Sequence, residues 1–95
     1  MGMKDDYQQK LEAKLEEWNA ELDKLRAKAK GAEADAEREI NKEVAQLEER
    51  RERARARLEE LRAASDDAWH DFKAGAERAF DEMSEAVRQA VARFR

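Results

Sequence analysis

Only a few residues of this chain could hold a metal ion, and His70 is the single histidine. Asp66 lies four residues earlier, and residues four apart share one face of a helix. A histidine and a carboxylate on one face form a weak metal-binding pair, but a metal site needs more than two protein ligands. His70 also falls on the polar side of the surrounding pattern. We therefore expect it to face solvent and predict no metal site.

Two pairs of adjacent carboxylates, Glu59-Glu60 and Asp81-Glu82, have the residue type used in general acid-base catalysis. That chemistry needs a pocket that shifts the pKa of a carboxyl group, and the outer surface of an amphipathic helix does not supply one. We expect these side chains to be exposed charges. The sequence predicts no catalytic residue, no cofactor and no enzymatic activity.

Arginines gather between Arg50 and Arg62, where they alternate with glutamates and no aromatic residue is interleaved. Over the whole chain, 20 basic and 24 acidic residues give a net charge of −4, and both signs are spread evenly. Nucleic-acid binding uses a basic patch, and single strands also stack on aromatic side chains. The sequence therefore predicts no nucleic-acid partner.

The composition is typical of long helices, because 46% of the 95 residues are charged, proline is absent and alanine is abundant. Without cysteine the chain cannot form disulfides or thiolate metal sites. There is no run of about 18 apolar residues that could span a bilayer and no apolar leader. We expect a cytoplasmic, all-α protein built from long amphipathic helices, which form a coiled coil or a small helical bundle.

The helices that position these residues are predicted from the spacing of the large apolar side chains. In the N-terminal half the spacing alternates between four and three, which is the heptad seam of a left-handed coiled coil. Asp5 or Asp6 can cap a helix that begins near Asp6, with Asp5 and Gln8 forming a capping box. We assign residues 1–3 to a start remnant and residues 4–36 to a heptad helix. The seam contains Leu11, Leu15, Trp18, Leu22, Leu25, Ala29, Ala32 and Ala36.

Residues 37–57 are predicted to be a charged transition segment. Ile40, Val44 and Leu47 continue the apolar face. The next large apolar residue is Leu58, and only alanines are apolar in between. The spacing also shifts here from heptads towards an 11-residue pattern, so we expect supercoiling to relax. This segment is the predicted weak point of any packed interface.

From residue 58 the sequence repeats every 11 residues, as LEELRAASDDA, WHDFKAGAERA and FDEMSEAVRQA, followed by VARFR. The apolar spacing of three, four and four keeps the large side chains on one stripe of a straight helix. We predict a hendecad amphipathic helix over residues 58–95. The alanines that end each repeat offer a smooth flank for a second helix. The stripe contains Leu58, Leu61, Trp69, Phe72, Phe80, Met83, Val87, Val91 and Phe94, and the flank contains Ala68, Ala79 and Ala90.

These 11-residue repeats without proline resemble the repeats of exchangeable apolipoproteins and of late-embryogenesis-abundant proteins. The three copies also look like the C-terminal part of small bacterial coiled-coil proteins. The resemblance covers residues 58–95. It implies amphipathic helices that pack on one another or lie on a lipid surface. The heptads of residues 4–36 depart from the repeat and favour a coiled coil over a lipid-exchange protein.

Two arrangements of the chain remain open at this point. The seam crosses Gly31 and Ser65 with no residue inserted or lost, which favours one unbroken helix of about 130 Å from Asp6 to Arg93. Gly31 lowers helix propensity, however, and Ser65, followed by two aspartates, is typical of a helix start. Breaks at both places would give three helices of about 25 to 30 residues in a small bundle.

Self-association is the leading functional hypothesis, because a lone helix would leave its large apolar side chains in water. Burying each of them is worth roughly 1.5 to 3 kcal/mol. We expect a structural or interaction protein that forms a homo-oligomer, with another protein as the second kind of partner. The predicted interaction face contains Leu11, Leu15, Trp18, Leu22, Leu25, Ile40, Val44, Leu47, Leu58, Leu61, Trp69, Phe72, Phe80, Met83, Val87, Val91 and Phe94.

Reversible binding to a lipid surface is the alternative hypothesis. Arg62 and Lys73 flank the apolar stripe of the repeats, while Asp71 and Glu82 point away from it. Basic side chains beside an apolar stripe can reach phosphate headgroups, with the acidic residues facing water. Flanking charges of this kind are also usual in coiled coils, and residues 64–95 carry more acidic than basic residues. Both points favour self-association.

Overall fold

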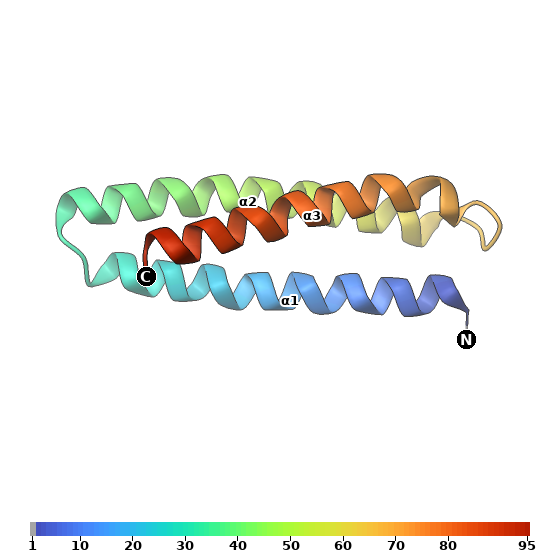
Figure 1. Cartoon of the computed structure of the whole chain (residues 1–95), viewed down its shortest axis with the longest axis horizontal. Helices are drawn as coiled ribbons and strands as arrows, with labels where there is room; N and C mark the ends of the chain where they lie inside the picture. Colours follow the sequence, from blue (N-terminus) through green and yellow to red (C-terminus); the bar gives the residue numbers. More distant parts are fainter. Residues whose placement is uncertain (1) are drawn as a thin grey trace.

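A computed structural model describes residues 2–95 and contains three α-helices and, within this range, no β-strand. Helix α1 spans Met3–Lys30, α2 spans Ala34–Ala63 and α3 spans Trp69–Arg93. Successive helices are antiparallel, so α3 returns alongside both α1 and α2 (Figure 1). The bundle measures 52 × 19 × 18 Å. The prediction of an all-α fold is confirmed, in the form of a small helical bundle.

The chain reverses direction at residues 31–33, directly after the first predicted break. Gly31 is the C-cap of α1, and its backbone N–H donates to the carbonyl of Lys28 at 3.2 Å. Lys28 and Lys30 lie in the last turn of α1, where positive charge interacts favourably with the helix dipole. The unbroken rod is therefore wrong. Uninterrupted apolar spacing does not require a continuous helix, because a reversed chain can bury the same seam against itself.

The second reversal, over residues 64–68, contains the predicted break at Ser65. The Ser65 hydroxyl oxygen accepts a hydrogen bond from the backbone N–H of Ala68 at 3.1 Å. The backbone carbonyl of Ser65 also accepts from the N–H groups of Ala68 and Trp69. These bonds form a turn that leads into α3. Ser65 thus starts this segment as predicted, although the regular helix begins at Trp69.

The N-terminus of α1 differs from the prediction. The helix begins at Met3 with Gly2 as N-cap and without a side-chain capping bond, so the Asp5 capping box does not form. Asp5 and Asp6 lie inside the first turn, where they still favour the positive end of the helix dipole. Of the predicted start remnant, Met3 belongs to α1, and Met1 lies outside the described residues.

The seam of α2 continues in heptads through the whole helix. Between Leu47 and Leu58 it passes through Arg51, whose side chain is 22% exposed, and through Ala54, which is fully buried. The Arg51 guanidinium remains at the surface and donates to the side-chain oxygen of Asn19 at 2.8 Å. Residues 37–57 are therefore no separate segment, and the boundaries predicted at 36 and 57 both fall inside α2. A buried alanine maintains the seam without a large side chain.

The buried side of α3 also follows heptads rather than the 11-residue columns. Leu58 and Leu61 of the first predicted repeat belong to α2, so the repeat does not form one helix. Phe72 is 38% exposed and Val91 is only partly buried, whereas Ala86, which stands between the columns, is buried. The spacing alternates between four and three through Trp69, Lys73, Ala76, Phe80, Met83, Val87, Ala90 and Phe94.

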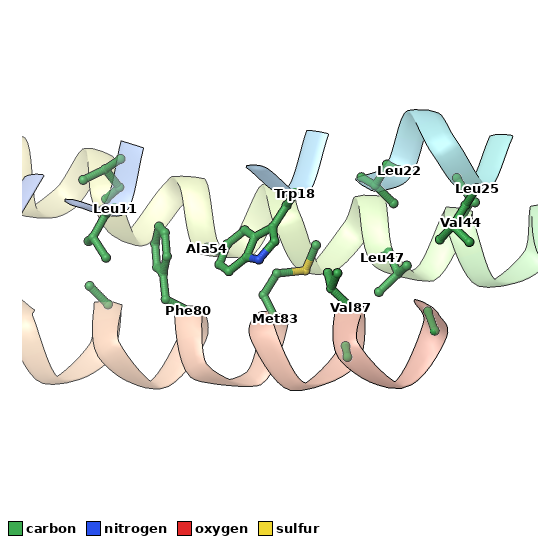
Figure 2. Packing of buried hydrophobic residues seen from close by; sticks show 14 of the residues in the cluster. Leu11, Trp18, Leu22, Leu25, Val44, Leu47, Ala54, Phe80, Met83 and Val87 are labelled. Atoms are coloured by element: carbon green, nitrogen blue, oxygen red, sulfur yellow. The ribbon is translucent and has the colours of Figure 1, made fainter. Parts of the chain in front are cut away.

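α3 places an aromatic ring against α1, whereas beside α2 it places small residues and, at its C-terminal end, the long side chain of Arg93. Phe80 lies against Trp18 of α1, with 5.1 Å between ring centroids, and Figure 2 shows the indole reaching the space between Phe80 and Met83. On the side towards α2, Arg93 pairs with Glu39 at 3.0 Å. Consistent with this difference, α3 contacts α2 far more than it contacts α1. Ala79 and Ala86, seven residues apart on one face of α3, line a hollow together with residues of α2.

Candidate interaction groove

The predicted interaction face is mostly the core of a single chain. Three of its residues, Leu15, Val91 and Phe94, are partly buried, and Phe72 is exposed. The bundle therefore already buries most of the seam that was expected to need a second copy. The buried members are Leu11, Trp18, Leu22, Leu25, Ile40, Val44, Leu47, Leu58, Leu61, Trp69, Phe80, Met83 and Val87.

The residues considered for chemistry lie at the surface. His70 is exposed, with its ring centroid 4.1 Å from that of Trp69, and Asp66 is exposed as well. No group of three or more potential metal ligands occurs among residues 2–95. Glu59 and Glu60 form ion pairs within α2, to Arg62 at 2.6 Å and to Arg57 at 2.8 Å.

An open groove lies between α2 and α3, with a volume of about 1130 Å³. We call it the α2/α3 groove. Small residues lie along it, because the positions of α3 beside α2 hold Ala79 and Ala86 instead of long side chains, and Gly75 lies one turn before them. Its lining residues are Arg50, Arg53, Ala56, Arg57 and Glu60 of α2, and Gly75, Arg78, Ala79, Asp81, Glu82, Glu85, Ala86 and Gln89 of α3.

The two walls of the α2/α3 groove carry charges of opposite sign. The α2 wall is basic through Arg50, Arg53 and Arg57, while the α3 wall is acidic through residues 81, 82 and 85. No ion pair joins the two walls anywhere in the described chain. Arg53 pairs instead with Glu49 of its own helix at 3.4 Å. The charges of each wall are therefore not neutralised by the opposite wall.

Glu85 on the acidic wall is held in its charged form. Its carboxylate accepts hydrogen bonds from the Arg88 guanidinium and from the Gln89 amide. The bond from Arg88 is the main cause that lowers the pKa of Glu85 below its usual value, and the bond from Gln89 adds to it. The negative charge of Glu85 therefore persists below the usual pKa of a glutamate.

The flank between α1 and α2 is built differently. There, Arg26 of α1 pairs with Glu48 of α2 at 3.1 Å, and Glu12 of α1 pairs with Arg62 of α2. The hydrogen bond that the Arg62 guanidinium donates to the Glu12 carboxylate is the main cause that raises the pKa of Arg62. The hollow along this flank is smaller, about 610 Å³. On this flank, long side chains of α1 and α2 form ion pairs with one another. Across the α2/α3 groove, no ion pair joins the lining residues of the two helices.

Only one of the residues that were predicted to pack against a second helix lines this groove. Of the predicted alanine flank, Ala79 lines the groove, Ala90 is buried in the core and Ala68 lies in the turn before α3. The heptad spacing of Phe72, Ala79 and Ala86 was the available signal. The 11-residue register concealed it, because that register places these three residues in different columns.

No family model, curated protein or solved structure matches the chain. None of the helices in the described range has a stretch long and apolar enough to cross a membrane. The described residues form an elongated three-helix bundle with an apolar core and an open groove between α2 and α3. Its function must therefore be inferred from this geometry.

Proposed function

We propose that this protein is a non-enzymatic structural or interaction module that self-associates through its helix surfaces. The observation that carries the proposal is the α2/α3 groove, which is open along two helices, holds small residues and has walls of opposite charge. Helices pack closely where small residues let their backbones approach, with interaxial distances of about 8 to 10 Å. A groove of this shape suits another helix better than a small molecule. A cytoplasmic location is part of the proposal.

A second copy of the chain is not needed to bury the apolar seam. The sequence alone suggested such a need, but in the bundle the seam already lies in the core of a single chain. Association would therefore join folded bundles and would not be required for folding. We expect a reversible equilibrium between monomer and oligomer, with helicity that is the same at low and high concentration.

Sedimentation equilibrium over a wide concentration range tests this proposal. The mass should rise from the 11.1 kDa of one chain to at least twice that value as the concentration increases. Circular dichroism recorded over the same range serves as the control and should stay constant. A chain that remains monomeric up to millimolar concentration would refute self-association.

Binding to a lipid surface remains the second candidate, and one feature of the core favours it. The buried side chains of the described residues are all apolar, with no buried polar or charged residue among them. Short connections at residues 31–33 and 64–68 could act as hinges. If the helices swung apart there, the core would become one continuous apolar stripe, as in the amphipathic helices of lipid-surface proteins.

Brominated lipids can distinguish this candidate. Trp18 and Trp69 are each 4% exposed in the closed bundle, so their emission is already that of buried indoles and a blue shift would be uninformative. Bromine atoms in the acyl chains quench tryptophan only when an indole enters the hydrocarbon. Quenching by brominated phosphatidylcholine vesicles would support opening on lipid, and unquenched emission would remove this candidate.

A further inference from the structure

We infer that the partner in the α2/α3 groove is a second copy of this chain, placed about a two-fold axis parallel to the long axis of the bundle. In this arrangement α2 of each copy lies against α3 of the other. The inference rests on the proposed self-association and specifies its surface and symmetry. It is carried by the charges of the two walls and by one exposed aromatic residue beside the groove.

The charges of the groove match a second copy. Its lining includes four basic and four acidic residues, so the groove as a whole carries no net charge. This balance does not favour a nucleic acid or an anionic membrane. The basic residues lie mainly on α2, however, and the acidic ones mainly on α3. A partner that presents an acidic helix to α2 and a basic helix to α3 complements both walls, and a second copy of the groove presents both.

Two face-to-face arrangements of a helix pair have two-fold symmetry, and the charges favour one of them. An axis perpendicular to the helices places α2 on α2 and α3 on α3, so like-charged walls meet. An axis parallel to the helices places each α2 on the α3 of the other copy, so basic walls meet acidic walls. Neighbouring helices are antiparallel in both cases, as in up-down bundles, so helix dipoles do not distinguish the two arrangements and the side-chain charges decide between them.

The register of α2 against α3 places the charges level with one another. Arg93 of α3 pairs with Glu39 and Glu43 of α2, at 3.0 and 3.8 Å. Counting along the antiparallel helices from this pair, Arg53 lies level with Glu82, and Arg50 with Glu85. A two-fold axis parallel to the helices preserves these heights. Each of these arginines then faces a glutamate of the second copy.

The two remaining positions of the groove also follow from this register. Arg78, the basic residue of the α3 wall, lies level with Arg57, which is already paired with Glu60 of its own helix at 2.8 Å. Arg78 therefore meets a neutralised pair of the second copy and not an unpaired arginine. Phe72 is 38% exposed and lies on the same face of α3 as Ala79, seven residues before it. It is level with the C-terminal end of α2. The α2 of a second copy would therefore cover Phe72.

Charge reversal of one wall at a time tests the inference. Variant A carries Arg50→Glu and Arg53→Glu, and variant B carries Glu82→Lys and Glu85→Lys. Each variant alone brings like-charged walls together, so its dimer dissociation constant should rise about tenfold or more. In a mixture, the acidic α2 of A meets the basic α3 of B, and the unchanged walls also match. The mixture should therefore dimerise while A and B alone do not.

A matched control keeps the charge change but moves it away from the groove. Arg55→Glu with Lys42→Glu alters the net charge as variant A does, at exposed positions of α2 that do not line the groove. It should dimerise like the natural sequence, and circular dichroism should show all variants folded. If A and B alone dimerise normally while the natural chain self-associates, the groove is not the interface, and only this inference fails. If the natural chain is monomeric, the proposed function fails as well.

Cross-linking separates the two symmetries, because the chain has no cysteine of its own. A mixture of the Arg53→Cys and Glu82→Cys chains, treated with a short bis-maleimide, should yield a heterodimeric product. Each chain treated alone should yield little. Efficient cross-linking of the Arg53→Cys chain to itself, without the mixed product, would indicate α2 against α2 and overturn the parallel axis.

Discussion

The two sides of α3 show how differently one helix can pack against its neighbours. Towards α1 it presents large side chains, and the aromatic pair Trp18–Phe80 fills the space between the helices. Towards α2 it presents small residues, among them Ala79 and Ala86, which line the groove. Large rings hold two backbones apart, whereas alanines let them approach. We therefore call the α1/α3 contact the wide side of the bundle and the α2/α3 contact the narrow side.

This asymmetry determines where the surface is hollow. On the narrow side, Ala79 and Ala86 continue the small residues out of the core and onto the rim, so the α2/α3 groove remains open. On the wide side, rings extend to the end of the bundle, where Tyr7 lies 6.0 Å from Trp69 between ring centroids. The side chains that keep α3 close to α2 therefore also leave the groove free for another helix.

Truncating the wide side should have the largest effect. Trp18→Ala removes a ring that is 4% exposed and packs on Phe80, and it leaves a cavity between α1 and α3. We expect the free energy of unfolding to fall by about 3 to 5 kcal/mol, enough to unfold much of a domain of this size. Urea denaturation followed by circular dichroism measures it. Phe72→Ala removes an exposed ring and should cost far less; equal losses would contradict a core position for Trp18.

Enlarging a residue on the narrow side should have the next largest effect. Ala76 has no exposed surface and lies one helical turn before Ala79 of the α2/α3 groove, so Ala76→Leu forces the helices apart or strains the new side chain. Such overpacking costs about 1 to 3 kcal/mol. Ala74→Leu, two residues earlier at an exposed position, is the matched control and should change the melting temperature little. A stabilised Ala76→Leu protein would mean that the α2/α3 contact is not close.

The helical class and most core residues could be predicted from the sequence, because apolar spacing depends only on helix geometry. The heptads of α1 were predicted residue by residue, and Leu11, Trp18, Leu22 and Leu25 are all buried. Reversal of the chain could not be predicted, since a seam that keeps its register across Gly31 fits either a rod or a hairpin. What decides between them is packing of residues distant in sequence, such as Trp18 on Phe80.

The groove could not be predicted for a related reason. The repeat placed Phe72 and Phe80 on one stripe, yet one is exposed and the other buried, because two neighbouring helices select a narrower and differently centred face. Alanine has the same high helix propensity in a core, on a rim and on an exposed surface. Which alanines remain uncovered depends on the position of α2, and the sequence of α3 does not contain that information.

Breaking the ion pair at the end of the narrow side should have a small effect. Arg93 reaches Glu39 and Glu43 across the helices, but its side chain is 57% exposed. Exposed pairs contribute about 0.2 to 1 kcal/mol. Arg93→Gln should lower stability by that amount, and more at low ionic strength than at high. Arg95→Gln, at the end of the chain, should have no such salt dependence. A larger loss for Arg93→Gln would show that this pair fixes the register of α3.

The smallest effect at neutral pH is expected on the wide side, at Tyr7. Its hydroxyl oxygen is buried and, within the described chain, has no hydrogen-bond partner. Lys73 lies over the ring, with Nζ 5.3 Å from its centroid. Burying an unpaired hydroxyl is unfavourable, so Tyr7→Phe should be neutral or slightly stabilising at pH 7. A clear loss of stability would indicate that the hydroxyl has a partner.

At high pH the same substitution should become clearly favourable. Burial, followed by the negative charges of Glu77 and Asp81, raises the pKa of Tyr7 to about 12, from 10.0 in an ordinary environment. Between these values the unfolded chain loses the phenol proton and the folded chain keeps it, so stability falls as pH rises from about 10 through about 12. Lysines also lose charge in this range, but they do so in both proteins. The natural chain should therefore lose more stability than Tyr7→Phe between about pH 9 and about pH 11.

Tyrosinate absorbance provides a direct check, because Tyr7 is the only tyrosine of the chain. A midpoint near 10 in the folded protein would show that the wide side is open to water at this end.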